Sequence, residues 1–189
     1  MLAIIGTAGR KEDEGRLTLP MWRDVYKGVR MRTRMMMVED LASGGAAWAD
    51  HLAVQLYLMN EVKSLHLFLP APFEGGRFRD IGGFGTKNPG GTSNYYHRKF
   101  SAKLKINSLA DIEEAIRKGA TVTVDSGGFF GRNSLLANAT NQVIALTFGA
   151  RDYAGPWVNA DVAGLKDGGT AHTWNRCQHH TYVEHICLR

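Results

Sequence analysis

The chain has 189 residues, of which 44% are hydrophobic and 22% charged, and 23 basic against 18 acidic residues give a net charge of +5. This composition is typical of a globular protein and excludes a disordered, collagen-like or coiled-coil chain. The length predicts a single domain over residues 1–189 that folds without disulfides or a metal. The basic charge favours anionic partners such as nucleotides or nucleic acid.

The cysteine count and the hydropathy pattern indicate a cytoplasmic protein. Cys177 and Cys187 both lie in the last thirteen residues, which is no disulfide framework and fits a reducing compartment. No apolar run is long enough to span a bilayer, so we expect no membrane partner. The N-terminal residues lack the basic region of a signal peptide.

The first seventy residues predict three strand-then-helix units. In chain order these are a strand over Leu2–Ile5, a helix over 20–34 that begins at Pro20, a strand over Met35–Ala42, helical spacing over Ala47–Asn60, and a strand over Ser64–Leu69. Repeated units of this kind favour a parallel sheet with right-handed crossovers.

Residues 71–107 have a different composition, with seven glycines and a basic-aromatic cluster over 95–100. A long segment of this kind predicts an inserted Gly-rich loop with a functional or partner-binding role. The rings and cations of the cluster, with Lys103 and Lys105, suit single-stranded nucleic acid. Because the charge excess is modest, we favour a lid over a nucleotide or a contact in a homo-oligomer.

The rest of the chain predicts alternating elements again. These are a helix from Ser108 to Gly119, a β-prone run over Ala120–Val124, a short helix over Asn133–Asn141, a strand over Val143–Phe148, a loop over 151–168, a helix over Gly169–His180 and a strand over Thr181–Leu188. The predicted fold class is α/β, a Rossmann-like open, mainly parallel sheet with helices on both faces and strand order 3-2-1-4-5.

Three Gly-rich junctions between a strand and a helix suggest where a ligand binds: Gly6–Arg10, Ser43–Ala46 and Asp167–Thr170. In an open α/β sheet, ligands lie at the carboxyl ends of the strands. Small residues there leave room for a phosphate, and the amides at the start of each helix can bind it. Arg10 can add a bidentate charged contact. The sequence therefore predicts a nucleotide-like small-molecule partner.

The motifs GTAGR, ASGGAAWADHLA, VIALTFG and KDGGTAHTW, in this order, resemble the SLOG superfamily of Rossmann-like domains. That superfamily includes the DprA/Smf proteins, the LOG cytokinin-activating phosphoribohydrolases and the YspA-like branch. YspA-like proteins carry a similar Ser-Gly-Gly-Ala-x-x-Ala-Asp, which matches Ser43 to Asp50 here. The resemblance covers about residues 1–69 and 130–187 and leaves 71–107 unexplained.

The resemblance implies a pocket for a nucleotide-derived ligand, such as an ADP-ribose-like signal or a nucleoside monophosphate, and no cofactor. The residues it assigns to the ligand are Gly6, Thr7, Ala8, Gly9, Arg10, Ser43, Gly44, Gly45, Ala46, Gly168, Gly169 and Thr170, with Arg132 and Asn133 at the rim. Trp48 is the candidate for an apolar wall against the base.

Two further functions remain open on the sequence alone. The LOG motif P-G-G-x-G-T-x-x-E is not kept, since Asp167 precedes the Gly pair and Trp174 falls near the position of the Glu. An N-glycosidase or a (deoxy)ribosyltransferase would need another carboxylate; Asp50, Glu39 and Asp125 lie near predicted strand ends, and Asp50 and Asp125 are the candidates. We favour Asp50 as an anchor of the glycine turn. The third candidate is a single-stranded DNA-binding accessory protein.

The C-terminal histidines and cysteines do not predict a metal site. Their spacing, C-x-H-H followed by H-x-C, matches no common structural zinc pattern. Buried thiols and a polar helix end account for these residues without a metal.

Overall fold

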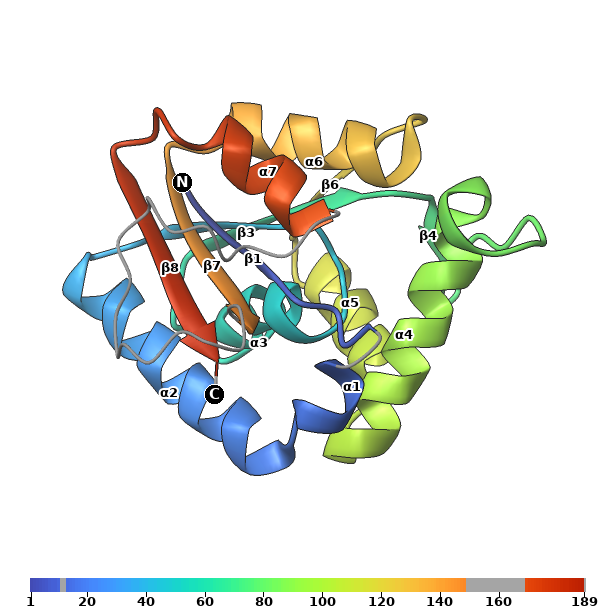
Figure 1. Ribbon diagram of the computed structural model, residues 1–189, viewed down its shortest axis with the longest axis horizontal. Helices are drawn as coiled ribbons and strands as arrows, with labels where there is room; N and C mark the ends of the chain where they lie inside the picture. The colour runs from blue at the N-terminus through green and yellow to red at the C-terminus, as the bar shows by residue number, and fades with distance from the viewer. Residues whose placement is uncertain (11–12, 149–168, 189) are drawn as a thin grey trace.

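The computed structural model describes residues 1–10, 13–148 and 169–188. Six parallel strands form one sheet in the order β6-β3-β2-β1-β7-β8 (Figure 1). The strands are β1 Leu2–Gly6, β2 Asp40–Ser43, β3 Ser64–Leu69, β6 Thr121–Val124, β7 Gln142–Phe148 and β8 Tyr182–Leu188. The predicted α/β class with an open parallel sheet is confirmed.

The strand order places the point of reversal at β1. β1 pairs with β2 on one side and with β7 on the other, so the chain builds the sheet outward in both directions from β1. The predicted order 3-2-1-4-5 is correct for β3, β2 and β1 and for the two C-terminal strands that follow. It counts one strand too few, because the run at 121–124 joins the sheet as β6 beside β3.

The central strands are buried on both faces, which explains their continuous apolar sequences. Leu2–Ile5 and Val143–Phe148 are entirely buried. Parallel strands are covered by helices on both faces, and they therefore have apolar runs in place of the alternation of a half-exposed strand. The edge strand β6 differs, with Val122 and Val124 exposed.

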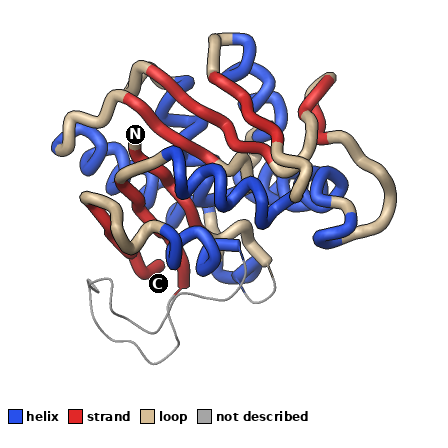
Figure 2. The backbone as a smooth tube through the Cα atoms, turned by 90° about the horizontal axis from the view of Figure 1, so that it is seen from above, coloured by secondary structure: helices blue, strands red, loops and turns tan. Residues whose placement is uncertain are grey.

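Helices cover the two faces of the sheet as two separate layers. α2 (Leu19–Met35), α3 (His51–Leu58) and α5 (Ser108–Arg117) pack on one face, and α6 (Gly128–Ala139) and α7 (Gly169–Arg176) on the other (Figure 1). Figure 2 shows α6 and α7 from above, lying over the strands. None of the described helices has the length and hydropathy needed to cross a membrane.

The segment 71–107 is mostly ordered secondary structure, which corrects the expectation of a Gly-rich loop. It forms the hairpin β4 (Phe73–Glu74) and β5 (Arg77–Phe78), the 3-10 turn η2 (Gly85–Lys87) and the helix α4 (Pro89–Leu104). Asn88 caps α4 by accepting a hydrogen bond from the Gly91 amide, and Pro89 occupies the first turn. The basic-aromatic cluster 95–100 therefore lies on a helix.

Several element boundaries also differ from the prediction. α2 continues to Met35, so β2 begins at Asp40, and α6 begins at Gly128, several residues before the predicted start. The sequence did not reveal the short helix α1 (Asp13–Arg16). The start of the second predicted helix, over Ala47–Asn60, is the 3-10 turn η1 (Trp48–Asp50). The predicted loop over 151–168 lies outside the described residues.

Candidate functional site

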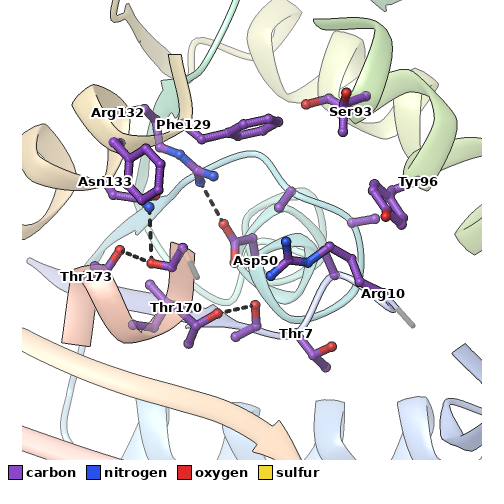
Figure 3. Close-up of a pocket in the computed structure, with 18 of the residues that line it drawn as sticks. Thr7, Arg10, Asp50, Ser93, Tyr96, Phe129, Arg132, Asn133, Thr170 and Thr173 are labelled. Atoms are coloured by element: carbon purple, nitrogen blue, oxygen red, sulfur yellow. Dashed lines mark hydrogen bonds and ion pairs between the residues drawn. The ribbon is translucent and has the colours of Figure 1, made fainter. Parts of the chain in front are cut away.

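A pocket of about 500 Å³ lies at the carboxyl ends of the central strands, beside the point where the strand order reverses. Its floor includes Gly6 at the end of β1 and Thr147 near the end of β7. The walls come from the β1 turn, η1, η2, α4, α6 and α7 (Figure 3). A cavity of this size and position is typical of a small-molecule site in an α/β protein.

The first Gly-rich junction lies on the pocket, as the sequence predicts. Gly6, Thr7, Ala8 and Arg10 line it. Gly9 does not, because it packs on the indole of Trp48: a Cβ on Gly9 would lie 2.8 Å from Nε1 of that ring. The Arg10 side chain extends toward the centre of the pocket (Figure 3).

Part of the hydrogen-bonding capacity of this junction is used within the protein. The amide of Thr7 donates to the carbonyl of Leu146 at 2.9 Å, and the amide of Gly9 donates to the Thr7 hydroxyl at 3.1 Å. The Thr7 hydroxyl in turn donates to the Asp13 carboxylate at 2.7 Å. These bonds fix the turn, and Arg10 is the charged side chain that the turn directs into the pocket.

The second junction does not provide the phosphate cradle that the sequence suggests. Of its four residues, only Ala46 lines the pocket. The backbone N–H groups of Ala46 and Gly44 interact with the Asp50 carboxylate, so a side chain of the protein takes the place expected for a phosphate. The Ser43 hydroxyl accepts from the Gly45 amide at 3.1 Å and donates to the Asp50 carbonyl at 2.9 Å. The anchor geometry expected for Asp50 is therefore present.

Asp50 also forms a buried ion pair with Arg132 across the base of the pocket. Nη1 of Arg132 donates to Oδ2 of Asp50 at 3.1 Å, and the two side chains, Arg132 and Asp50, are 9% and 5% exposed (Figure 3). Burial raises the pKa of Asp50, and the guanidinium of Arg132 acts against that rise. Gly44 makes the pair sterically feasible, because a Cβ there would lie 1.4 Å from Nη1 of Arg132.

Arg132 has more hydrogen-bond donors than the described protein atoms satisfy. Among the described residues, its only hydrogen-bond acceptor is Asp50, and its buried Nε has no partner. A guanidinium carries five N–H donors, and leaving them unpaired in a buried site is costly. The pocket therefore contains a fixed cation that can donate further hydrogen bonds to a ligand.

The third junction lines the pocket beside the first, to which it is hydrogen-bonded. Gly169 and Thr170, at the start of α7, line it, whereas Gly168 lies outside the described residues. The hydroxyl of Thr170 donates to the carbonyl of Gly6 at 2.8 Å, and Nδ2 of Asn133 donates to the carbonyl of Gly169 at 3.1 Å. These bonds tie α6 and α7 to the end of β1. Asn133 and Arg132 lie on the pocket as predicted.

Beyond Gly9, Ser43, Gly44 and Gly45, two further predicted site residues lie away from the pocket. Asp125 does not line the pocket; its carboxylate accepts from the Gly127 amide at 2.5 Å in the turn before α6. Trp48 is buried in the core, where its ring packs against Trp22 and Phe100 at centroid distances of 5.9 and 4.9 Å. The structure therefore removes Asp125 from the candidate site and Trp48 from the expected apolar wall.

The apolar wall is formed by aromatic residues that the site prediction missed. Phe84 and Tyr96 come from the 71–107 segment, and Phe129 and Phe130 come from the start of α6. Phe84 is 57% exposed, and its ring is nearly perpendicular to that of Tyr95, with 5.5 Å between the centroids. The aromatic composition of 95–100 was the signal for this wall, but only Tyr96 of that cluster lines the pocket.

Three other members of the 95–100 cluster have structural roles. His97 and Phe100 are fully buried, and Nζ of Lys99 pairs with the carboxylate of Glu14 at 2.8 Å. Lys103, which follows the cluster on α4, donates to the carbonyl of Glu14. These contacts join α4 to α1 and leave fewer cations for nucleic acid than the sequence suggests.

The charged side chains on the described pocket wall balance one another. Arg10 and Arg132 are the cations, and Asp50 and Asp13 are the anions. Asp13 was not predicted, because it follows the Gly-rich turn in a polar stretch without a motif. The remaining polar side chains are neutral and mostly hydroxyls: Thr7, Thr86, Thr92, Ser93, Asn133, Thr147, Thr170, Thr173 and Tyr96.

Two of the C-terminal histidines contact hydroxyl groups of other elements. Nε2 of His185 lies 2.7 Å from the hydroxyl of Thr147, and Nε2 of His180 lies 3.1 Å from that of Thr140. Within residues 1–10, 13–148 and 169–188, no group of three or more histidine, cysteine or acidic side chains is arranged to hold a metal ion.

The fold and the pocket define a Rossmann-like α/β protein with a small-molecule-sized site at the carboxyl edge of its sheet. The chain is 33% identical over 184 residues to "Uncharacterized protein R261" of Acanthamoeba polyphaga mimivirus, and the match covers 94% of this chain and 91% of that protein. The chain belongs to the same family as this mimivirus protein. It matches no family model and no solved structure.

Proposed function

We propose that the protein binds a nucleotide or a nucleotide-derived small molecule in this pocket, in keeping with its resemblance to the SLOG superfamily. The observation that carries the proposal is the position of Arg132, a buried cation with one acceptor among the described residues, in the same cavity as an aromatic wall. A nucleotide supplies an anionic group for the cation and a planar base for the rings.

Catalysis at the glycosidic bond has less support than binding. The Asp50 carboxylate already interacts with two backbone amides and with Arg132. A nucleophile or an oxocarbenium-stabilising group needs an oxygen directed at the anomeric carbon. Nucleic-acid binding is also less supported, because Lys99 and Lys103 are engaged with Glu14.

The test is calorimetric titration of the protein with nucleosides and nucleotides, with chromatography of the mixture for released base. The proposal predicts saturable binding without base release. Arg10→Gln should weaken the binding about tenfold, because a charge-assisted contact is lost. Arg23→Gln, an exposed position on α2 outside the pocket, is the matched control and should leave the affinity unchanged. Base release would favour the glycosidase, and no binding of any nucleotide would overturn the proposal.

A further inference from the structure

The wall of the pocket that comes from the inserted segment 71–107 differs in chemistry from the wall that comes from α6. The lining residues of the inserted segment are uncharged and include two aromatic rings: Phe84, Gly85, Thr86, Thr92, Ser93 and Tyr96. The α6 wall also has rings, but it adds the buried guanidinium of Arg132. In Figure 3, Tyr96 and Ser93 lie on the right of the cavity, and Arg132 and Asn133 lie on the left. The two walls therefore suit different parts of one ligand.

Phe84 is held at the pocket by the start of α4. Gly83 and Gly85, on either side of it, have φ of 81° and 71–72° in the left-handed region, which glycine adopts without strain. Nδ2 of Asn88 donates to the carbonyl of Gly83 at 3.1 Å, and the Gly85 amide donates to the Thr92 hydroxyl at 2.7 Å. Phe84 thus lines the pocket and is still 57% exposed, so this large apolar side chain has area left to bury against a ligand.

Tyr96 brings a second ring to the same wall. The centroids of the Phe84 and Tyr96 rings lie 6.4 Å apart, and the ring planes are inclined by 48°. Two rings at such an angle form a corner in which a planar group can stack on one ring and meet the other with its edge, the arrangements that aromatic pairs prefer. The hydroxyls of Thr86 and Ser93, on the same wall, can donate hydrogen bonds to the edge of a base or accept them from it.

We infer, on the basis of the proposed function, that the inserted segment forms the base subsite of the pocket. Phe84 and Tyr96 stack on the base, whose flat faces suit aromatic rings. The anionic part of the ligand lies toward Arg132, because a buried cation attracts an anion more strongly than an exposed one does. The ligand therefore lies across the pocket from α4 to α6, and the segment that the SLOG resemblance leaves unexplained recognises the base.

The experiment separates the two parts of the ligand. The nucleotide that binds most tightly in the calorimetric titration is compared with its nucleoside, which lacks the phosphate, and with ribose 5-phosphate, which lacks the base. Phe84→Ala should weaken the binding of the nucleotide and the nucleoside about tenfold, because stacking is lost, and leave that of ribose 5-phosphate within about twofold. Arg10→Gln should weaken the binding of the nucleotide and of ribose 5-phosphate and leave that of the nucleoside unchanged.

Ile81→Ala is the matched control in the same loop. Ile81 is 69% exposed and does not line the pocket, so its loss should leave all three affinities unchanged. Tyr96→Phe keeps the ring and should bind like the wild-type protein, whereas Tyr96→Ala should weaken the ligands that contain a base. Phe84→Trp reports stacking directly, because a base in contact with an indole quenches its fluorescence. The nucleotide should quench this variant and ribose 5-phosphate should not.

The outcomes separate this inference from the proposed function. Equal weakening of all three ligands by Phe84→Ala, or weakening of none, would overturn the base subsite and leave the nucleotide proposal standing. If ribose 5-phosphate binds too weakly to titrate, the fluorescence decides: a nucleotide that binds Phe84→Trp without quenching it would overturn the base subsite. A complete absence of nucleotide binding by the wild-type protein would overturn the proposed function itself.

Discussion

Gly44 allows the ion pair beneath the pocket to form. Replacing it with alanine places a methyl group where Nη1 of Arg132 lies, 2.6 Å from the Asp50 carboxylate. We expect Gly44→Ala to separate the pair and lower the free energy of unfolding by about 3 kcal/mol, because a buried charge loses its partner. Urea denaturation measures this loss.

The matched control for that substitution is Gly15→Ala. Gly15 lies exposed in α1, and a Cβ added to it would meet no other atom within 4 Å, so alanine there should be neutral or slightly stabilising. Equal stability of the two variants would show that the pair does not depend on the space at Gly44.

His97 makes the stability of the protein depend on pH. Its ring is fully buried, with Nε2 at 3.0 Å from the carbonyl of Gly45 and Nδ1 at 2.9 Å from the hydroxyl of Ser108. The neutral tautomer with the proton on Nε2 satisfies both contacts, and burial lowers the pKa of His97 from 6.5 to about 3.

The expected sign follows from the order in which the two states take up a proton. The unfolded chain protonates His97 near pH 6.5 and the folded protein only near pH 3. The contribution of the neutral His97 ring to the free energy of unfolding is therefore fully present above pH 6.5, and it is lost as the pH falls from 6.5 toward 3. Between pH 7.5 and pH 5 the loss should be about 2 kcal/mol. Urea denaturation at both values tests it; His97→Gln should reduce the loss, and the exposed His179→Gln should not.

At the scale of elements, α4 depends on one asparagine. Asn88 accepts from the amide of Gly91 at the start of the helix, and its Nδ2 donates to the carboxylate of Asp80 at 2.6 Å and to the carbonyl of Gly83 at 3.1 Å. The same side chain therefore caps α4 and holds the segment that carries Phe84 to the pocket.

Asn88→Ala should cost about 2 kcal/mol of unfolding free energy, more than the roughly 1 kcal/mol of a cap alone, because buried polar groups also lose their partner. Asn107→Ala is the matched control, since Asn107 caps α5 through a single bond to the Ala110 amide. Thermal denaturation ranks the two variants, and equal losses would show that the bonds to Asp80 and Gly83 contribute little. Amide hydrogen exchange in 80–88 should increase only in Asn88→Ala.

The sequence did not identify α4 because its usual helical signals are weak. Gly90 and Gly91 occupy the first turn, and the buried residues include Asn94 and His97, which an apolar stripe does not reveal. Asn94 exchanges hydrogen bonds with the backbone of Phe78 in β5, at 3.0 and 2.8 Å. The polar inner face of α4 thus binds the hairpin, a tertiary contact that leaves no periodic pattern.

At the scale of the whole molecule, stability depends on two apolar clusters, one on each face of the sheet. Val143 in β7 is fully buried under α6 and α7, whereas Val122 in the edge strand β6 is 36% exposed. Val143→Ala should lower the unfolding free energy by about 2.5 kcal/mol through lost burial and the cavity left behind. Val122→Ala should cost less than about 1 kcal/mol, because that side chain already contacts water. Chemical denaturation of both variants checks the difference.

The sequence by itself determined the sheet and the edge at which a pocket lies. The apolar runs at 2–5 and 143–148 predicted strands buried on both faces, and the glycines that follow β1 predicted a turn open to a ligand. Both signals are local: burial on two faces demands continuous apolar residues, and a tight approach of the backbone demands small ones. Arg132 was also correctly placed at the pocket, since a residue near the start of a helix at this edge faces the site.

Only the tertiary structure decided which groups face the pocket. Whether the amides after β2 bind a phosphate or a carboxylate depends on Asp50, and its orientation is set by Arg132, which is 82 residues away in the sequence. Likewise, Trp48 is in the core and Phe84 on the pocket because of how α4 packs beside η1. Contacts between residues far apart in the sequence are determined by packing and by the cost of burying an unpaired charge. Neither of these is a property of a local stretch of sequence.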